Sequence, residues 1–300
     1  MGVLELNTKM TTRYMDPAPQ SRRLLPALAL CGTLGLYSWL AGCSVLVDAD
    51  RPQCSADSDC TERGFVGAVC QAGLCKVNPQ WTCDPVLPAA APSYKLTMHL
   101  QEAVSSAPLP GVVAQRCRKL DLICENPVDM TFADTNGGVT MQIEAGFDGY
   151  VQLTGAKIAP SLYFLNPPSS GDLNLPTVPL ASPLVAAGLV LQAGGTTWNK
   201  ERGIVLLNAF DCAGKPAANI TYSIAGAPDP STFIFYMVDA YPTTDVTVTD
   251  DTGYGGLVNV PVGVSTVSAL LEPGGRKVSQ LSVLVRAGYV SYSSVTPNSL

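Results

Sequence analysis

The sequence predicts an all-β fold of two tandem β-sandwiches with a short connecting helix and a small disulfide-rich N-terminal segment. Three observations lead to this prediction. Gly and Pro fill 51 of the 300 positions, which favours a turn-rich β protein. Stretches that alternate apolar and polar residues recur between turn sequences, as half-buried strands do. The pattern of Met141, Ile143 and Gly146 recurs 117 positions later, which indicates a tandem duplication.

The composition excludes several classes of function. From Cys43 onward the chain has 14 Lys and Arg against 22 Asp and Glu, without a basic stripe. Nucleic-acid binding is therefore not expected, because the phosphate backbone requires clustered basic side chains. The only histidine is His99, and the sequence has neither a Gly-x-Ser-x-Gly elbow nor a phosphate loop. We therefore expect no enzymatic activity, no catalytic residue, no cofactor and no metal.

The N-terminus has the features of an export signal. Arg22 and Arg23 precede an apolar run that ends in Leu40-Ala41-Gly42-Cys43, and this ending resembles the lipobox of bacterial lipoproteins. The resemblance implies that residues 1–42 are a cleaved signal peptide, that Cys43 is acylated, and that residues 43–50 form a tether. Because Ser44 follows the cysteine, we expect a lipid-anchored protein of the bacterial outer membrane or cell surface, with the membrane as a partner.

Cysteine usage predicts a disulfide framework. Cys31 leaves with the signal peptide and Cys43 carries lipid, so eight cysteines remain in an exported chain. These eight are Cys54, Cys60, Cys70, Cys75, Cys83, Cys117, Cys124 and Cys212. Zinc is the alternative, but no Cys-x-x-Cys spacing occurs and one histidine is too few for the common mixed sites.

Residues 51–87 form the expected cysteine-rich segment, with the spacing Cys-x5-Cys-x9-Cys-x4-Cys. It resembles short cysteine-rich repeats of secreted proteins from predatory soil bacteria and, more loosely, EGF-like knots. Because a segment this short cannot bury a useful apolar core, crosslinks must hold it together. The EGF-like resemblance implies Cys54 with Cys70 and Cys60 with Cys75, although four cysteines allow three pairings. Closeness in sequence favours Cys117 with Cys124, which would leave Cys83 and Cys212 to join the N-terminal region to the second sandwich.

Two acidic groups offer carboxylates for calcium. Asp57 and Asp59 lie in the cysteine-rich segment, and Asp245, Asp250 and Asp251 lie near the duplicated turn. Calcium prefers six to eight oxygen ligands, which two or three carboxylates do not supply alone. We therefore favour solvated acidic turns.

The first sandwich is expected over residues 93–166. Tyr94 to Gln101 alternates apolar and polar side chains without a break, as a half-buried strand does. Together with later turns it resembles the carboxypeptidase regulatory-like domain, a transthyretin-like, Ig-type β-sandwich. The matching positions are Leu109, Gly111, Val112, Asp134, Gly137, Val139, Gly146, Gly149 and Tyr150. The zinc-binding histidines of the peptidases that carry this domain are absent, so peptidase activity does not follow from the resemblance.

A connector with a short helix is expected over residues 167–202. Ser182 is a suitable cap, Pro183 suits the first helical position, and Gly194 and Gly195 provide the stop. We expect this helix to pack at the domain junction.

The second sandwich is expected over residues 203–300, with a longer loop inserted from Pro228 to Asp250. The insertion holds the candidate partner-binding residues Phe233, Phe235, Tyr236 and Tyr241. Two interpretations are open. Length and composition favour a buried strand for the run around Phe235. The alternative is an exposed aromatic platform for a sugar or a protein.

These features predict a non-enzymatic cell-envelope lipoprotein that acts as a surface binding or display scaffold. Its partner would be an unknown envelope protein or a glycan. The alternative function is a carbohydrate-binding accessory protein of a secreted hydrolytic system.

Overall fold

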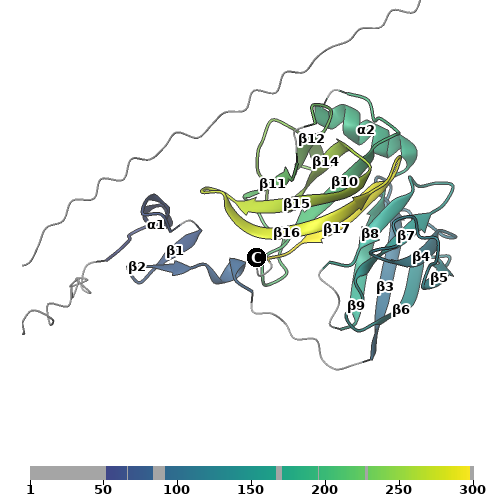
Figure 1. The fold of residues 1–300 in the computed structure, drawn as a ribbon, viewed down its shortest axis with the longest axis horizontal. Helices are drawn as coiled ribbons and strands as arrows, with labels where there is room; N and C mark the ends of the chain where they lie inside the picture. Colours follow the sequence, from purple (N-terminus) through teal and green to yellow (C-terminus); the bar gives the residue numbers. More distant parts are fainter. Residues whose placement is uncertain are drawn as a thin grey trace, which may run out of the picture. The chain divides into compact units, whose positions relative to one another are not determined.

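The computed structural model describes residues 52–65, 67–83, 92–166, 171–194, 196–226 and 229–297, and they form a predominantly β protein (Figure 1). All of them belong to one compact unit, Asp50–Leu300. The expected signal peptide, the acylation site Cys43 and the tether lie outside the described residues.

The cysteine-rich segment is a small crosslinked hairpin with one helical turn on each side. Its elements are α1 (Asp57–Glu62), β1 (Ala68–Gln71), β2 (Leu74–Val77) and a 3-10 turn (Pro79–Trp81). The two strands pair antiparallel, with Cys70 opposite Cys75. Disulfides join Cys54 to Cys70 and Cys60 to Cys75, the alternating arrangement that the EGF-like resemblance implies.

The first sandwich packs a three-stranded sheet against four strands of a larger sheet. The small sheet has the order β6 (Gly138–Glu144), β3 (Ser93–Glu102) and β9 (Leu173–Leu180). The facing strands are β4 (Val113–Arg118), β5 (Asp129–Phe132), β7 (Gly149–Thr154) and β8 (Ser161–Phe164). The alternation predicted for Tyr94 to Gln101 is present in β3, since Leu96, Met98 and Leu100 are fully buried in this core.

The second sandwich repeats this arrangement. Its small sheet consists of β11 (Ile220–Ile224), β15 (Gly263–Leu271) and β16 (Arg276–Val285). The facing strands are β10 (Gly203–Ala209), β12 (Phe233–Val238), β13 (Tyr241–Thr243), β14 (Tyr254–Val260) and β17 (Val290–Val295). Tyr222, Leu207 and Leu257 are among the side chains that fill its core, and this core continues onto Tyr150 and Phe164 of the first sandwich.

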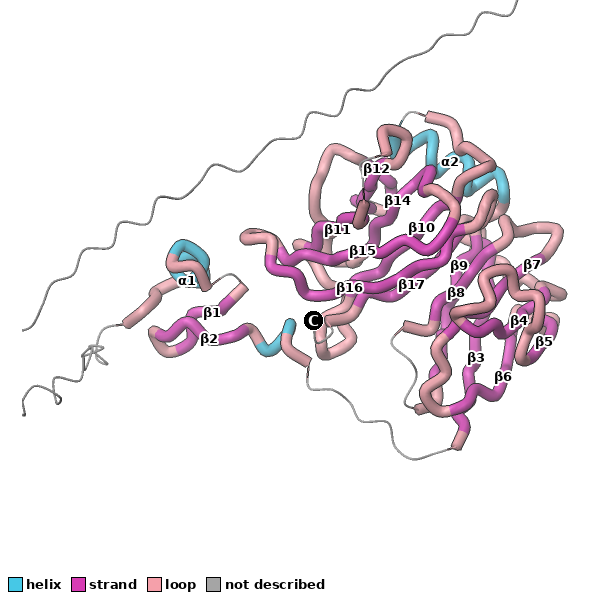
Figure 2. The backbone as a smooth tube through the Cα atoms, viewed as in Figure 1, coloured by secondary structure: helices cyan, strands magenta, loops and turns pink. Residues whose placement is uncertain are grey.

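The two sandwiches share one sheet, as the magenta strands in Figure 2 show. β17 pairs parallel with β10 on one side and with β8 on the other, so nine strands run in the order β13-β12-β14-β10-β17-β8-β7-β4-β5. The expected domain boundaries therefore shift. The first sandwich continues past Asn166, because β9 from the expected connector returns to pair parallel with β3.

The connecting helix is α2 (Pro183–Gly194), and it begins where the sequence predicts. The Val185 N–H donates to the Ser182 hydroxyl over 3.2 Å, which satisfies one of the unpaired amides of the first turn. Its buried face, with Ala186 and Val190, packs into the same apolar cluster as Phe235 of the sheet. In the described part of the chain no helix has the length and apolar character needed to span a bilayer.

The aromatic run around Phe235 is a sheet strand, as its length and composition favour, and the alternative of an exposed binding platform at Phe233, Phe235 and Tyr236 is wrong. Phe235 is 0% exposed and Tyr236 3% exposed, and β12 pairs with β14 through Phe235 opposite Gly256. A Cβ on Gly256 would come within 3.0 Å of the Phe235 ring, so the glycine makes room for it. Phe233 is half-buried against α2, and only Tyr241 remains exposed.

Candidate functional site

A cleft of about 440 Å³ lies between the cysteine-rich segment and the second sandwich. One wall comes from α1, the start of β1 and the 3-10 turn. The other wall comes from the turn after β10 and the end of β15. The cleft thus combines residues that are far apart in the sequence.

The two walls are joined covalently. A disulfide links Cys83 to Cys212, and the Cys212 N–H donates to the Gln80 carbonyl over 2.9 Å. The side chain of Trp81 enters the core of the second sandwich, and Arg276 donates to the Thr82 hydroxyl over 3.4 Å. A disulfide and a buried aromatic side chain therefore hold the cysteine-rich segment against the second sandwich.

The wall of the cysteine-rich segment offers both donors and acceptors. The Asp57 carboxylate accepts the Cys70 N–H over 2.7 Å through one oxygen, and Asn78 caps the 3-10 turn by accepting the Gln80 N–H over 3.0 Å. Asp57 therefore has one carboxylate oxygen without a partner among the described residues. Trp81, which is 9% exposed, also lines the cleft.

The opposite wall is acidic. The buried Asp211 carboxylate accepts the amides of Ala213 and Lys215, over 2.8 and 2.9 Å, and so forms the turn itself. Glu272 accepts the Gly274 amide over 2.9 Å and the Gly275 amide over 3.2 Å through one oxygen. The side chains that line the cleft include three carboxylates but no lysine, arginine or histidine.

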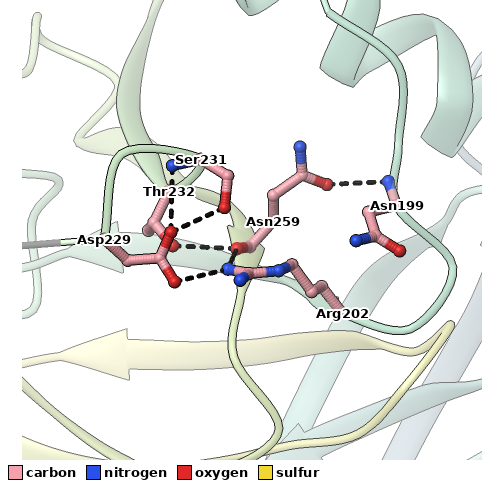
Figure 3. A network of polar contacts seen from close by, with 6 residues as sticks. All are labelled: Asn199, Arg202, Asp229, Ser231, Thr232 and Asn259. Carbon is pink, nitrogen blue, oxygen red and sulfur yellow. Dashed lines mark hydrogen bonds and ion pairs between the residues drawn. The ribbon is translucent and has the colours of Figure 1, made fainter.

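A second polar cluster holds the loop before β10 against the end of β14. Figure 3 shows its members, Asn199, Arg202, Asp229, Ser231, Thr232 and Asn259. Arg202 donates to Asp229 over 2.8 Å and to the Asn259 carbonyl over 2.9 Å, and Thr232 donates to the same carbonyl over 2.8 Å. The members satisfy one another and the cluster includes no nucleophile paired with a base, so it serves to hold loops.

The Ser231 hydroxyl and amide, with the Arg202 guanidinium beyond them, lower the pKa of Asp229 to about 2. These groups donate hydrogen bonds to the ionised carboxylate and so favour the charged form. The carboxylate is therefore ionised at any pH at which the protein would work.

The other predicted residues fall into three groups. The eight cysteines form four disulfides, which include Cys117 with Cys124 as well as the link to Cys212. The sulfurs of Cys54, Cys60 and Cys75 lie within 4.8 Å of one another, but each belongs to a disulfide and offers no thiolate to a metal.

His99 lies on the exposed face of β3. Asp59 and Asp250 accept hydrogen bonds from nearby turn residues, namely Ser55 and Ala56 for Asp59 and Thr252 for Asp250. The sequence analysis missed Trp81, Asn78 and Glu272. The signal that could have found them was the expected link from Cys83 to Cys212, which brings the 3-10 turn to the second sandwich.

No protein-family model matches the chain, and no curated protein matches it significantly in sequence. Some solved structures are similar in fold. The TIE protein of Bacillus anthracis has a TM-score of 0.24 and 10% identity, and the match covers 69% of this chain but 34% of that one. The shaft pilin SpaA of Lactobacillus rhamnosus GG has a TM-score of 0.22 and 11% identity, with coverage of 69% and 98%.

A streptococcal ancillary pilin has a TM-score of 0.24 and 12% identity, and the match covers 71% of this chain and 64% of the pilin. By the coverage given above, this chain spans about a third of the length of the Bacillus anthracis protein.

Proposed function

We propose that this chain is a non-enzymatic lipoprotein of the bacterial cell envelope, anchored through Cys43 and acting as a surface binding or display scaffold. The observation that carries the proposal is the construction of the compact unit. Two sandwiches share one nine-stranded sheet, and a disulfide fixes the cysteine-rich segment to the second of them. Such a body suits a tethered protein, because rigid sheets hold binding surfaces in place while loops vary.

The absence of enzymatic activity belongs to the same proposal. In the cleft, Asp211 is used to form a turn, and the lining includes no histidine to act as a general base. In the cluster of Figure 3 every charge is paired. The resemblance of the first sandwich to the carboxypeptidase regulatory-like domain agrees with a binding or spacing role.

One observation favours the alternative, a carbohydrate-binding accessory of a secreted hydrolytic system. The cleft combines a tryptophan with amide and carboxylate side chains, and such mixed walls suit hydroxyl-bearing ligands. A protein of either kind would meet its partner, an envelope protein or a glycan, outside the cytoplasm.

Fractionation of cells that produce Cys43→Ser tests the anchoring. Each buried methylene of an acyl chain contributes about 0.8 kcal/mol to membrane binding, and two chains already anchor a protein stably. The variant should leave the membrane fraction or remain uncleaved, whereas Cys31→Ser, which changes a residue of the discarded segment, should behave like the wild type. A Cys43→Ser protein that is cut at the same bond and stays membrane-bound would refute the anchoring.

A further inference from the structure

The nine-stranded sheet ends in a strand whose outer edge has no partner. β5 is the last strand in the order of this sheet, and it pairs with β4 on one side (Figure 1). Among the described residues, no strand pairs with its second edge. We propose that this edge pairs antiparallel with β5 of a second copy of the chain, so that the protein forms a two-fold symmetric dimer. The inference goes beyond the scaffold role proposed above and does not depend on the lipid anchor.

The main-chain groups at this edge point outward. The Ala133 N–H donates to the Val112 carbonyl over 2.9 Å, so Phe132 belongs to a non-hydrogen-bonded pair of the β4–β5 ladder. The N–H and C=O groups of Phe132 therefore point away from β4, and by the period of two those of Met130 do as well. The Met130 N–H donates to the carboxylate of the adjacent Asp129 over 2.8 Å, an exposed local contact that a partner strand can replace.

The side chains of the same two residues are apolar and exposed. Met130 is 52% exposed and Phe132 is 61% exposed. They lie on the sheet face opposite to that of Thr131, which pairs with Ala114 of the first core. Three further exposed apolar side chains belong to the loop that joins β4 to β5, namely Leu120, Leu122 and Ile123. Five of the fourteen large apolar side chains exposed in the described residues thus lie within 120–132, and such a concentration is typical of an interaction surface.

The sequence of β5 is self-complementary. In an antiparallel pair centred on Thr131, Met130 of each copy lies opposite Phe132 of the other. Each such pair can exchange two main-chain hydrogen bonds, and it brings a methionine against an aromatic ring. Asp129 falls opposite Ala133 of the other copy, so no like charges meet. A lipid surface is disfavoured as the partner, because hydrocarbon would leave the outward N–H and C=O groups unsatisfied.

The other sheet edges carry features that discourage such pairing. β13, at the opposite end of the large sheet, contains Pro242, and β9 contains Pro176 and Pro179. The exposed side chains of β6 are polar, namely Thr140, Gln142 and Glu144. Prolines and charged side chains are common protections of edge strands. β5 has no proline, lysine or arginine, so it is the least protected of these edges.

Sedimentation equilibrium of the chain from Ser44 onward tests the dimer. This chain keeps every described residue and lacks the acylated cysteine. An interface made by one short strand is small, so we expect weak association, with a mass that rises toward twice that of the chain as its concentration approaches about 1 mM. Phe132→Lys should abolish this rise, since edge lysines oppose pairing. Tyr241→Lys changes an equally exposed aromatic residue on the edge strand β13, and it should associate like the wild type.

Charged variants test whether the edge pairs with itself. Met130→Lys combined with Phe132→Lys, and Met130→Glu combined with Phe132→Glu, place like charges opposite each other in each homodimer. Each of these two proteins alone should therefore be monomeric. An equimolar mixture of them should form heterodimers, because each lysine then lies opposite a glutamate.

Thr131→Cys tests the register. The two copies of this residue would face each other at the centre of the pair with a Cα separation of about 4.5 Å, which a disulfide can span. Mild oxidation should therefore crosslink Thr131→Cys into a dimer and leave Tyr241→Cys uncrosslinked.

Three results would overturn the inference. A wild type that is monomeric at every concentration would do so, and it would leave the β5 edge to an extended segment of another protein. A mixture of the two folded charged variants that stays monomeric would do the same. The third result is loss of association in Tyr241→Lys while Phe132→Lys still associates.

Discussion

Asp229 and Arg202 show how single residues fix the loops at one end of the shared sheet. Arg202 reaches from the segment before β10 to the carboxylate of Asp229 and to the carbonyl of Asn259. Asn259 itself has a φ of 54°, a conformation that costs energy for a residue with a side chain. The hydrogen bonds that its amide and carbonyl groups make with Asn199, Arg202 and Thr232 offset this cost.

Asp229→Asn should change the acid sensitivity of the protein. The folded-state pKa of about 2 lies below the ordinary value of about 3.9. The carboxylate therefore stabilises the fold above about pH 4, and this contribution is lost as the pH falls toward 2. Compared with the wild type, the variant should have a lower Tm at pH 7 and a smaller further loss between pH 4 and 2.

Ser231→Ala is the matched control for this pH dependence. Ser231 is the main cause of the lowered pKa, so its hydroxyl's removal should move the acid transition of Asp229 to higher pH. Tm measured against pH by calorimetry checks both variants. Curves for Asp229→Asn and the wild type that stay parallel from pH 7 to pH 2 would contradict the assignment.

At the scale of elements, the sequence predicted the features that depend on neighbouring residues, but it did not predict which distant strands pair. The alternation from Tyr94 predicted β3, and Ser182 with Pro183 predicted the start of α2, because both signals act within a few residues. The sequence placed β9 in the connector, and Pro176 and Pro179 interrupt the alternation that would indicate a strand there. Prolines are tolerated there because β9 is an edge strand, which is a property of the assembled sheet.

β12 is a second element whose structure depends on a residue far away in the sequence. Its aromatic residues fit both a buried strand and an exposed platform, and what decides between them is Gly255 and Gly256 on the neighbouring strand. No pattern within β12 itself reveals that neighbour. The candidate cleft was equally hidden, since Trp81 and Glu272 meet only through the fold and the link from Cys83 to Cys212.

Phe235→Ala should therefore destabilise the second sandwich. The ring is 0% exposed and packs with α2, and removal of such a side chain typically costs about 3–5 kcal/mol. Tyr241→Ala on the exposed strand β13 should change the free energy of unfolding by less than about 0.5 kcal/mol. Urea unfolding of both variants measures the difference, and equal effects would mean that β12 is not a core strand.

At the scale of the whole molecule, the two sandwiches are bound together by more than the shared sheet. Arg286 follows β16 of the second sandwich and donates to Tyr150, Gln152 and the Leu122 carbonyl of the first. Its guanidinium also lies 5.4 Å from the centre of the Tyr150 ring, which adds a cation–π contact. Because β17 completes the sheet between both cores, neither sandwich is a separate module.

The disulfide from Cys83 to Cys212 should contribute most of its stability through the unfolded chain. It spans 129 residues, and loop-closure entropy gives about 5 kcal/mol for a loop of this length. The disulfide from Cys117 to Cys124 spans 7 residues, for which the same relation gives about 2 kcal/mol. Replacing both cysteines of the long link by alanine should thus cost more than replacing both cysteines of the short one.

Thiol titration of denatured, non-reduced protein makes this comparison interpretable. We expect no free thiol in the mature wild type or in either double variant, and one in Cys212→Ala alone, since Cys83 then loses its partner. Urea unfolding then compares the two double variants. If the long link costs no more than the short one, Cys83 and Cys212 are not joined in the folded protein. The cysteine-rich segment would then have no covalent link to the second sandwich.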